Sequence, residues 1–245
     1  MFVHLRLHTE FSVVDGTCRI DDVLKAAQAD GQPALAITDL NNLFGGLKFY
    51  KSARSKGVKP VLGAELVMQP QGDEGESRLL VLVQNHQGYL NLSEILARAW
   101  TQPLGKTQTQ AQVAWAWLQE LHAGLIVLSG AHTGLVGQAL LRGDAATASR
   151  HALALAEMFP HRFYLELQRA GRAEDEALVA QTVELAARLQ LPVVATQPIQ
   201  FLRPDDFQAH EARVCIAEGE VLANAKRPRR FTQEQYFKNS LQMQE

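Results

Sequence analysis

Cysteine is scarce in this sequence of 245 residues, and an excess of either charge is missing. Cys18 and Cys215 are the only two cysteines and lie far apart, which excludes a disulfide framework and predicts reduced thiols. Lysine and arginine number 24 against 26 aspartate and glutamate residues, so the formal net charge is −2. Proteins that bind nucleic acid over a broad surface carry a basic excess, so we expect any contact with nucleic acid to be local.

Long apolar runs are also missing. No uninterrupted apolar stretch approaches the roughly 18 residues of a membrane span, and the first six residues lack the apolar core of a secretion signal. Together with reduced thiols, this predicts a cytoplasmic protein without membrane contact. The composition, 47% hydrophobic and 20% charged, excludes disorder and fits one globular unit or at most two small ones.

Short apolar runs alternate with longer segments whose apolar residues recur every three or four positions, which is typical of strands followed by helices. Most of the strands are continuously apolar, as parallel strands covered on both faces should be. This rhythm predicts a closed or nearly closed α/β barrel, with a doubly wound open sheet as the alternative. Strands are expected at 3–7, 34–38, 58–67, 79–84, 125–129, 163–168 and 193–196, and helices at 20–29, 43–56, 89–100, 113–121, 134–141, 145–159, 174–189 and 205–218.

Helix ends and loops are also marked in the sequence. Gly31 and Gly57 each follow a predicted helix and precede a proline by two or three residues, as at many helix exits. Residues 69–77 and 101–112 are rich in Gly, Pro and Gln and predict exposed loops. From residue 222 the rhythm gives way to a basic run and a polar helix candidate reaching Glu245. We therefore expect a barrel domain over 1–221 and a C-terminal extension over 222–245, within a longer protein.

In an α/β barrel the reactive groups follow the C-terminal ends of the strands. His8, Asp15, Asp39 and Glu65 follow or end the first three predicted strands, and imidazole and carboxylates are what a divalent cation needs. The later strand ends contribute almost nothing ionisable, whereas a hydrolytic two-metal centre requires several carboxylates and imidazoles. Taken alone, these residues indicate half a site.

Several ordered segments closely resemble the N-terminal PHP (polymerase and histidinol phosphatase) domain of bacterial DNA polymerase III alpha subunits. The resemblance covers essentially the whole chain and implies a distorted seven-unit βα (TIM-like) barrel, in agreement with the rhythm above. The matching segments are 2–16, 33–39, 42–45, 59–63, 88–92, 124–130, 193–196, 207–211 and 226–229.

Family members with an intact centre bind a cluster of divalent metal ions. We assign the ligand positions of the family to this sequence one residue at a time. The opening His-x-His becomes Arg6-Leu7-His8, and the Asp of the following Asp-Gly is kept as Asp15. The His after Thr-Asp is replaced by Leu40, and the Glu of the third strand is kept as Glu65.

The second half of the ligand set is lost. The His of the next strand aligns with Arg78, the Cys after Ser-Gly becomes Ala131, and the closing Asp-x-His becomes Pro198-Ile-Gln200. Leu, Ala, Pro and Arg offer no lone pair to a metal ion. The resemblance thus implies a dismantled metal site with no catalytic residue and no bound metal.

Two of the replacements are arginines. We expect Arg6, and with it Arg78, to neutralise the carboxylates left at Asp15 and Glu65 by pairing with them. The three retained groups admit two interpretations, a residual weak cation site or a hydrogen-bonded polar cluster that stabilises the barrel mouth, and we favour the second.

Other polar residues near the strand ends have simpler interpretations. Asp39 is expected to cap the next helix through its carboxylate, and His132 would replace a lost ligand only by coincidence of geometry. The glycine-rich segment 130–137 matches neither phosphate-binding spacing and predicts a structural turn.

Two surface features concern partners. The basic run 226–230 is interpreted as a solvated or packing segment in preference to a phosphate contact. Trp115 and Trp117 lie two residues apart and cannot share one helical face, so either one is exposed for a partner or both lie at a loosely packed helix edge.

The resemblance implies that the parent protein is a DNA-directed DNA polymerase, a nucleotidyltransferase whose magnesium centre lies in a palm domain outside this chain. For the chain itself we expect a cofactor-free, inactive scaffold that docks the proofreading exonuclease subunit and the rest of the alpha subunit, with at most peripheral DNA contact. The alternatives are an active metal-dependent phosphoesterase or 3′–5′ exonuclease, and a barrel enzyme acting on a small molecule without metal.

Overall fold

The computed structural model describes residues 2–72, 74–104, 110–224 and 226–244. Its contacts divide the chain into two compact units, each of which is formed by discontinuous segments. Unit 1 comprises 1–62, 169–172 and 196–245, and unit 2 comprises 63–168 and 173–195.

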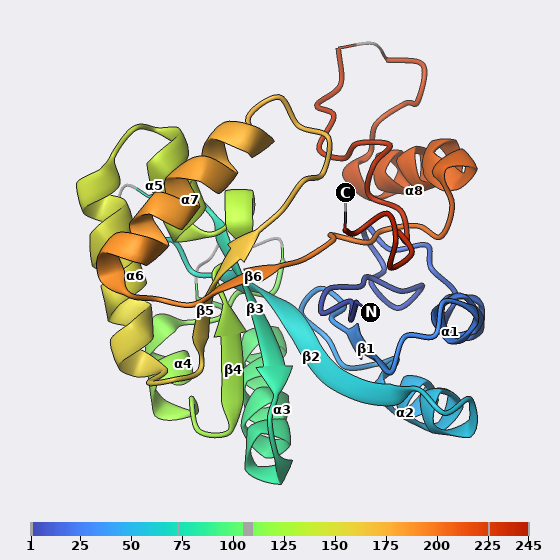
Figure 1. The fold of residues 1–245 in the computed structure, drawn as a ribbon, viewed down its shortest axis with the longest axis horizontal. Helices are drawn as coiled ribbons and strands as arrows, with labels where there is room; N and C mark the ends of the chain where they lie inside the picture. Colours follow the sequence, from blue (N-terminus) through green and yellow to red (C-terminus); the bar gives the residue numbers. More distant parts are fainter. Residues whose placement is uncertain (1, 73, 105–109, 225, 245) are drawn as a thin grey trace. The chain divides into compact units, whose positions relative to one another are not determined.

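In unit 1, helix α1 (Ile20–Ala29) packs against helix α2 (Gly46–Ser55) and against the short strand β1 (Ala34–Ile37) that lies between them in the chain (Figure 1). Its core is made of Leu7, Ile20, Leu24, Leu35 and Phe49, all fully buried. Burial of large aliphatic and aromatic side chains on this scale is the main stabilising contribution to such a unit. The elements are α1 (Ile20–Ala29), β1 (Ala34–Ile37), α2 (Gly46–Ser55), the start of β2 (Lys59–Met68), a 3₁₀ turn (Pro204–Asp206) and α8 (Phe207–Glu218).

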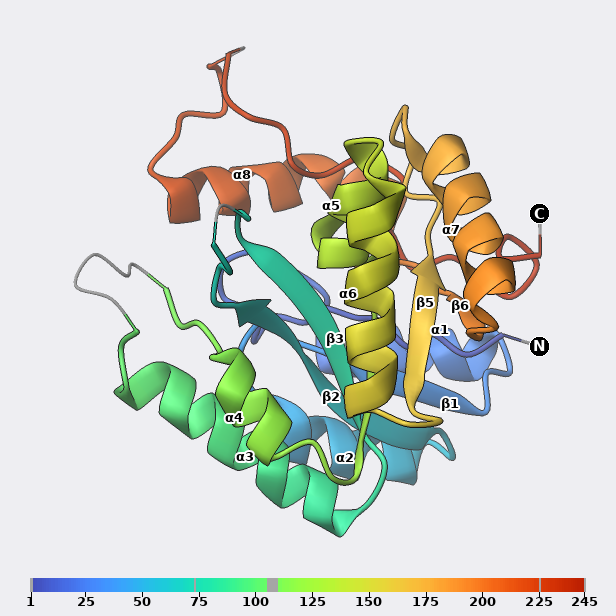
Figure 2. The same cartoon turned by 90° about the vertical axis from the view of Figure 1, so that its left-hand side faces the viewer.

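Unit 2 is built around the remainder of β2 and the four strands that follow it. Helix α3 (His86–Thr101) packs against β3 (Ser77–Val83) and β4 (Leu125–Leu128) (Figure 1). Helices α6 (Ala145–Met158) and α7 (Asp175–Leu189) pack against β5 (Phe163–Leu167) (Figure 2). The elements are β3 (Ser77–Val83), α3 (His86–Thr101), α4 (Trp115–Glu120), β4 (Leu125–Leu128), a 3₁₀ turn (Ala131–Thr133), α5 (Leu135–Leu141), α6 (Ala145–Met158), β5 (Phe163–Leu167), α7 (Asp175–Leu189) and β6 (Val193–Ala195).

The strands pair in chain order, β1 to β6. β1 pairs with residues 59–62 of β2 in parallel, and β4–β5 and β5–β6 are parallel as well. β3, however, is antiparallel to both β2 and β4. The expectation of parallel strands is wrong for β3. Residues 69–76 are too few for the crossover helix that parallel neighbours need, so β3 runs opposite to β2. β4 runs in the same direction as β2 and is therefore antiparallel to β3 as well.

Two expected elements are absent from the described residues. The first predicted strand, 3–7, makes only isolated bridges, His4 with Leu35 and Leu7 with Ile199. The polar helix expected before Glu245 is wrong, because that segment is held in extended and turn conformations. The Phe237 N–H donates to the Phe201 carbonyl at 3.1 Å, and buried Phe237 packs into the core of unit 1. Backbone groups that are hydrogen-bonded to another segment in this way are not available for the hydrogen bonds of a helix.

The other expected elements are confirmed, with ends that shift by up to three residues. Gly31 and Gly57 adopt φ values of 66° and 73°, as the helix-exit interpretation requires. Residues 70–72, 75 and 76 are exposed, in agreement with the first predicted loop, but Ser77 is buried and begins β3. In the second predicted loop, Gln102, Pro103 and Gln110 are exposed and Ala111 is buried, while residues 105–109 lie outside the described residues. Within the described part of the chain, no helix combines the length and apolarity needed to cross a membrane.

Candidate functional site

A buried polar cluster in unit 1 contains two of the three residues that the resemblance implies are retained ligands. The His8 Nδ1–H donates to Asp15 Oδ1 at 2.8 Å, and the Ser12 hydroxyl donates to the same oxygen at 2.7 Å. His8, Ser12 and Asp15 are all at most 2% exposed. Ser12 in turn accepts the Leu40 N–H at 3.1 Å, so the hydroxyl links the two loops that follow the first two predicted strands.

The backbone of this cluster is held by a histidine that sequence reasoning missed. The His210 Nε2–H of α8 donates to the Asp15 carbonyl at 2.7 Å, and His210 is fully buried. Burial lowers the pKa of His210, which keeps the imidazole neutral at neutral pH. The signal in the sequence was a histidine within an expected helix, which does not by itself reveal its partner.

Asp39 does not cap the next helix. The N-cap of α2 is Gly45, and no side chain caps that end. Instead, Asp39 accepts the Thr9 N–H at 2.6 Å and the Thr9 hydroxyl at 2.9 Å, because the loop after residue 7 lies directly over the end of β1. Burial raises the pKa of Asp39 to about 6, against the effect of these hydrogen bonds.

The other replaced positions of unit 1 have structural contacts. Arg6 is buried, so its guanidinium is not in solvent. The Gln200 N–H donates to the Gln235 carbonyl at 2.9 Å, and the Gln200 carbonyl accepts the Thr17 N–H at 3.0 Å. The Pro198 carbonyl accepts the side-chain amide of Gln235 at 3.4 Å. This segment thus joins the C-terminal residues to the rest of unit 1.

The third retained carboxylate lies in unit 2. Glu65 is 1% exposed, and the Arg78 Nη1 donates to its Oε2 at 3.2 Å. The pairing follows from the β2–β3 register, which places Arg78 opposite Val67 and therefore on the diagonal from Glu65. The expected ion pair is confirmed for Arg78 and Glu65, whereas the pairing of Arg6 with a carboxylate stays a prediction.

Ala131, which the resemblance aligns with the family cysteine, lies in a tight 3₁₀ turn. Ala131 is buried and His132 beside it is partly buried. The preceding Gly130 has a φ of 81°, and its N–H donates to Glu166 Oε2 at 3.0 Å. Glu166 is a buried acid that sequence reasoning did not single out, although a carboxylate in a strand expected to be buried is itself a signal. The glycine-rich segment is a structural turn, as predicted.

The structure also shows the surroundings of the basic run 226–230 and of the two tryptophans. Arg227 is buried and ion-paired with Glu211 of α8, which supports the packing interpretation. Arg230 Nε lies 3.1 Å from Glu218 Oε1. Trp115 and Trp117 are both half-buried, so neither is a fully exposed partner residue.

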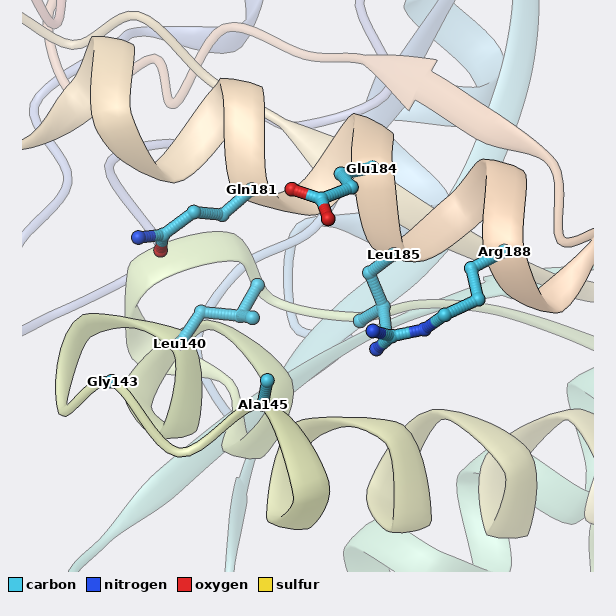
Figure 3. Close-up of a pocket in the computed structure, with 7 residues that line it drawn as sticks. All are labelled: Leu140, Gly143, Ala145, Gln181, Glu184, Leu185 and Arg188. Carbon is cyan, nitrogen blue, oxygen red and sulfur yellow. The ribbon is translucent and has the colours of Figure 1, made fainter.

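A shallow hollow in unit 2 lies between α7 and the α5–α6 turn (Figure 3). It has a volume of about 220 Å³, and its polar lining consists of Gln181, Glu184 and Arg188, all of which are exposed. Arg188 also donates to the Ser149 hydroxyl at 2.8 Å. The hollow therefore contains no buried acid, base or nucleophile.

The side chains of neither unit fit a metal cluster. Among the described residues, no group of three or more His, Cys, Asp or Glu side chains is arranged to hold a metal ion. The carboxylate of Asp15 accepts two hydrogen bonds and that of Glu65 faces a guanidinium, which is a poor neighbour for a cation.

Solved structures with a similar fold define the class of protein. An amidohydrolase from Chromobacterium violaceum superposes with a TM-score of 0.56 at 14% identity, covering 86% of this chain and 96% of its own. A Bacteroides vulgatus two-domain protein containing a predicted PHP-like metal-dependent phosphoesterase gives 0.51 at 12% identity, covering 81% and 51%. At these identities only the fold is shared, and the expected class, a distorted βα barrel, is confirmed.

The PHP domain model matches residues 4–170, and the chain belongs to this family. The DNA polymerase III alpha subunit of Neisseria meningitidis serogroup A is 49% identical over 96% of the chain. Those of Pseudomonas aeruginosa and Escherichia coli K12 are 43% and 42% identical over 100% and 99% of it. The chain spans about a fifth of the length of these relatives, 21% in each case.

Proposed function

We propose that this chain is a non-catalytic scaffold domain of a replicative DNA polymerase, and that it docks the proofreading exonuclease subunit. The relatives named above carry the name of a polymerase subunit, and the chain aligns with about a fifth of each. In this proposal, polymerisation with its magnesium centre belongs to the part of the protein outside this chain.

The ion pair between Arg78 and Glu65 is the observation that carries the inactive half of the proposal. A metal ion next to Glu65 would have to displace or repel a permanent guanidinium charge 3.2 Å away. In unit 1, Asp15 is likewise engaged by His8 and Ser12, so its carboxylate stabilises a loop instead of binding a cation.

Calorimetric titration of the protein with Mn²⁺ and with Zn²⁺, together with a phosphoester hydrolysis assay, tests the inactive half. We expect no saturable metal binding and no turnover, and the same result for His8→Ala. Stoichiometric metal binding, or hydrolysis that His8→Ala abolishes, would establish the alternative of a metal-dependent phosphoesterase or exonuclease.

The docking half requires a separate measurement. We expect the purified protein to give a saturable heat on titration with the proofreading exonuclease subunit of the same polymerase. Absence of binding by calorimetry would refute the docking role, even if the protein proved to be metal-free and inactive.

A further inference from the structure

The segment that carries α2 and the start of β2 is basic in a protein whose net charge is −2. Residues 40–62 contain Lys48, Lys51, Arg54, Lys56 and Lys59 and no acidic residue. Two of these cations are neutralised by acids from other segments, because Lys48 Nζ lies 2.9 Å from Glu10 and Lys56 Nζ lies 3.6 Å from Asp21. Lys51, Arg54 and Lys59 form no ion pair within the described residues, and all three are exposed.

Two of these cations, Arg54 and Lys59, line a hollow, and Lys51 lies about one turn before Arg54 on α2. The hollow has a volume of about 410 Å³ and is lined by Tyr50, Arg54, Lys59 and the rings of Pro33 and Pro60. The Arg54 Nη1 donates to the Tyr50 hydroxyl at 3.1 Å, and the guanidinium carbon lies 5.7 Å from the centre of the ring. Arg54 therefore fixes the ring in place, although Tyr50 is 41% exposed.

The geometry points to a contact with single-stranded nucleic acid on this face, which we call the α2 basic face: Tyr50, Lys51, Arg54 and Lys59. One base would lie against the Tyr50 ring, and backbone phosphates would meet the three cations. An aromatic platform combined with cations that carry no internal counter-charge is how proteins bind single strands without reading their sequence.

The observations favour a nucleic acid over an acidic peptide. An extended peptide would need backbone donors along a strand edge, but Pro60 near the start of β2 has no N–H to offer. A helical peptide would need a long apolar groove, whereas this hollow is bounded by Pro33, the second half of α2 and the residues from there to the start of β2. A single base and its phosphates match both the size and the charge of the hollow. The inference does not depend on the scaffold proposal, since a catalytically inactive domain can still bind single-stranded nucleic acid.

Fluorescence anisotropy of labelled oligothymidylate, about 12 nucleotides long, tests this inference. Three phosphate contacts predict that log K falls with log salt with a slope of about −2. The charge-reversal variant K51E/R54E/K59E should weaken binding about tenfold or more at low salt and flatten the slope. The matched control K25E/R142E/K226E carries the same charge change at exposed positions elsewhere and should stay within about twofold of the wild type.

Variants of Tyr50 provide a second test, because a purely electrostatic contact would not depend on this ring. Tyr50→Ala should weaken binding about tenfold. Tyr50→Phe should leave it nearly unchanged, because stacking needs the ring and not the hydroxyl, and the Arg54 guanidinium still packs against a phenyl ring. Equal binding of oligothymidylate and oligouridylate would support the shared chemistry, and a preference for either would identify the source.

Three results would overturn the inference. One is the absence of saturable binding at low salt by a protein whose circular dichroism shows it to be folded. Another is an equal loss of binding in the control variant. The third is displacement of the oligonucleotide by a Glu/Leu peptide of matched charge, with the same dependence on Tyr50, because this would assign the face to an acidic protein partner.

Discussion

The Arg78 guanidinium lies diagonally across the β2–β3 pair from the Glu65 carboxylate, and the two groups form an ion pair in which the acid is almost completely buried. Such a pair contributes little net stability, because desolvation offsets most of the attraction. Removing one partner is costly, since a buried charge is left without compensation.

We therefore expect Arg78→Met to lower the free energy of unfolding by about 2–4 kcal/mol, measured by urea denaturation. The double variant Arg78→Met/Glu65→Gln should recover most of this loss, because the buried charge is then absent as well. A single variant as stable as the wild type would show that Glu65 is compensated without Arg78.

Asp39 gives a pH-dependent prediction. Its pKa is about 6 in the folded protein and about 4 in an unfolded chain, so the folded state holds the proton more tightly. The contribution of Asp39 to stability is therefore fully present below about pH 4 and is lost as the pH rises through about 6. The free energy of unfolding is measured in urea at pH 4 and at pH 7, for the wild type and for Asp39→Asn. We expect the decrease between the two pH values to be smaller in Asp39→Asn, by up to about 3 kcal/mol.

Asp30 is a matched control of opposite sign. Although burial opposes it, hydrogen bonds from Gln32 and Ser240 lower the pKa of Asp30. Its contribution is present at neutral pH and lost as the pH falls through the folded pKa, so Asp30→Asn should reduce the loss of stability on acidification. The same pH response in both variants would contradict these assignments.

The basic run offers a comparison between neighbouring arginines. Arg227 is buried against Glu211, whereas Arg229 is exposed. Arg227→Met should lower the free energy of unfolding by about 2–4 kcal/mol, while Arg229→Met should change it by less than about 0.5 kcal/mol. Thermal or urea unfolding of both variants measures this, and equal effects would show that the run acts only through its overall charge.

Gly134 lies so close to a neighbouring backbone carbonyl that a side chain does not fit there. A Cβ at this position would lie 1.7 Å from the Ser129 carbonyl oxygen, whereas a Cβ at Gly75 would meet nothing within 4 Å. Gly134→Ala should therefore destabilise the protein by about 3 kcal/mol or more, and Gly75→Ala by less than about 0.5 kcal/mol. Near-equal unfolding midpoints in urea would mean that the turn can relax without cost.

Periodicity and turn chemistry determined most of the elements. α1 was predicted with its observed ends, because its apolar spacing and Gly31 are local signals carried by the residues themselves. The expected loss of metal ligands likewise rests on composition, since Leu40, Ala131 and Pro198 have no coordinating side chain wherever the chain places them.

Pairing between distant segments was decided only by the tertiary structure. A continuously apolar strand fits a parallel or an antiparallel neighbour, so the direction of β3 depended on the short connection before it. Asp39 had a local role available as a helix cap, but the loop carrying Thr9 lies closer to its carboxylate. In the same way His210, far along the chain, holds the Asp15 loop. Such contacts join residues far apart in sequence, and no local pattern encodes which of them meet.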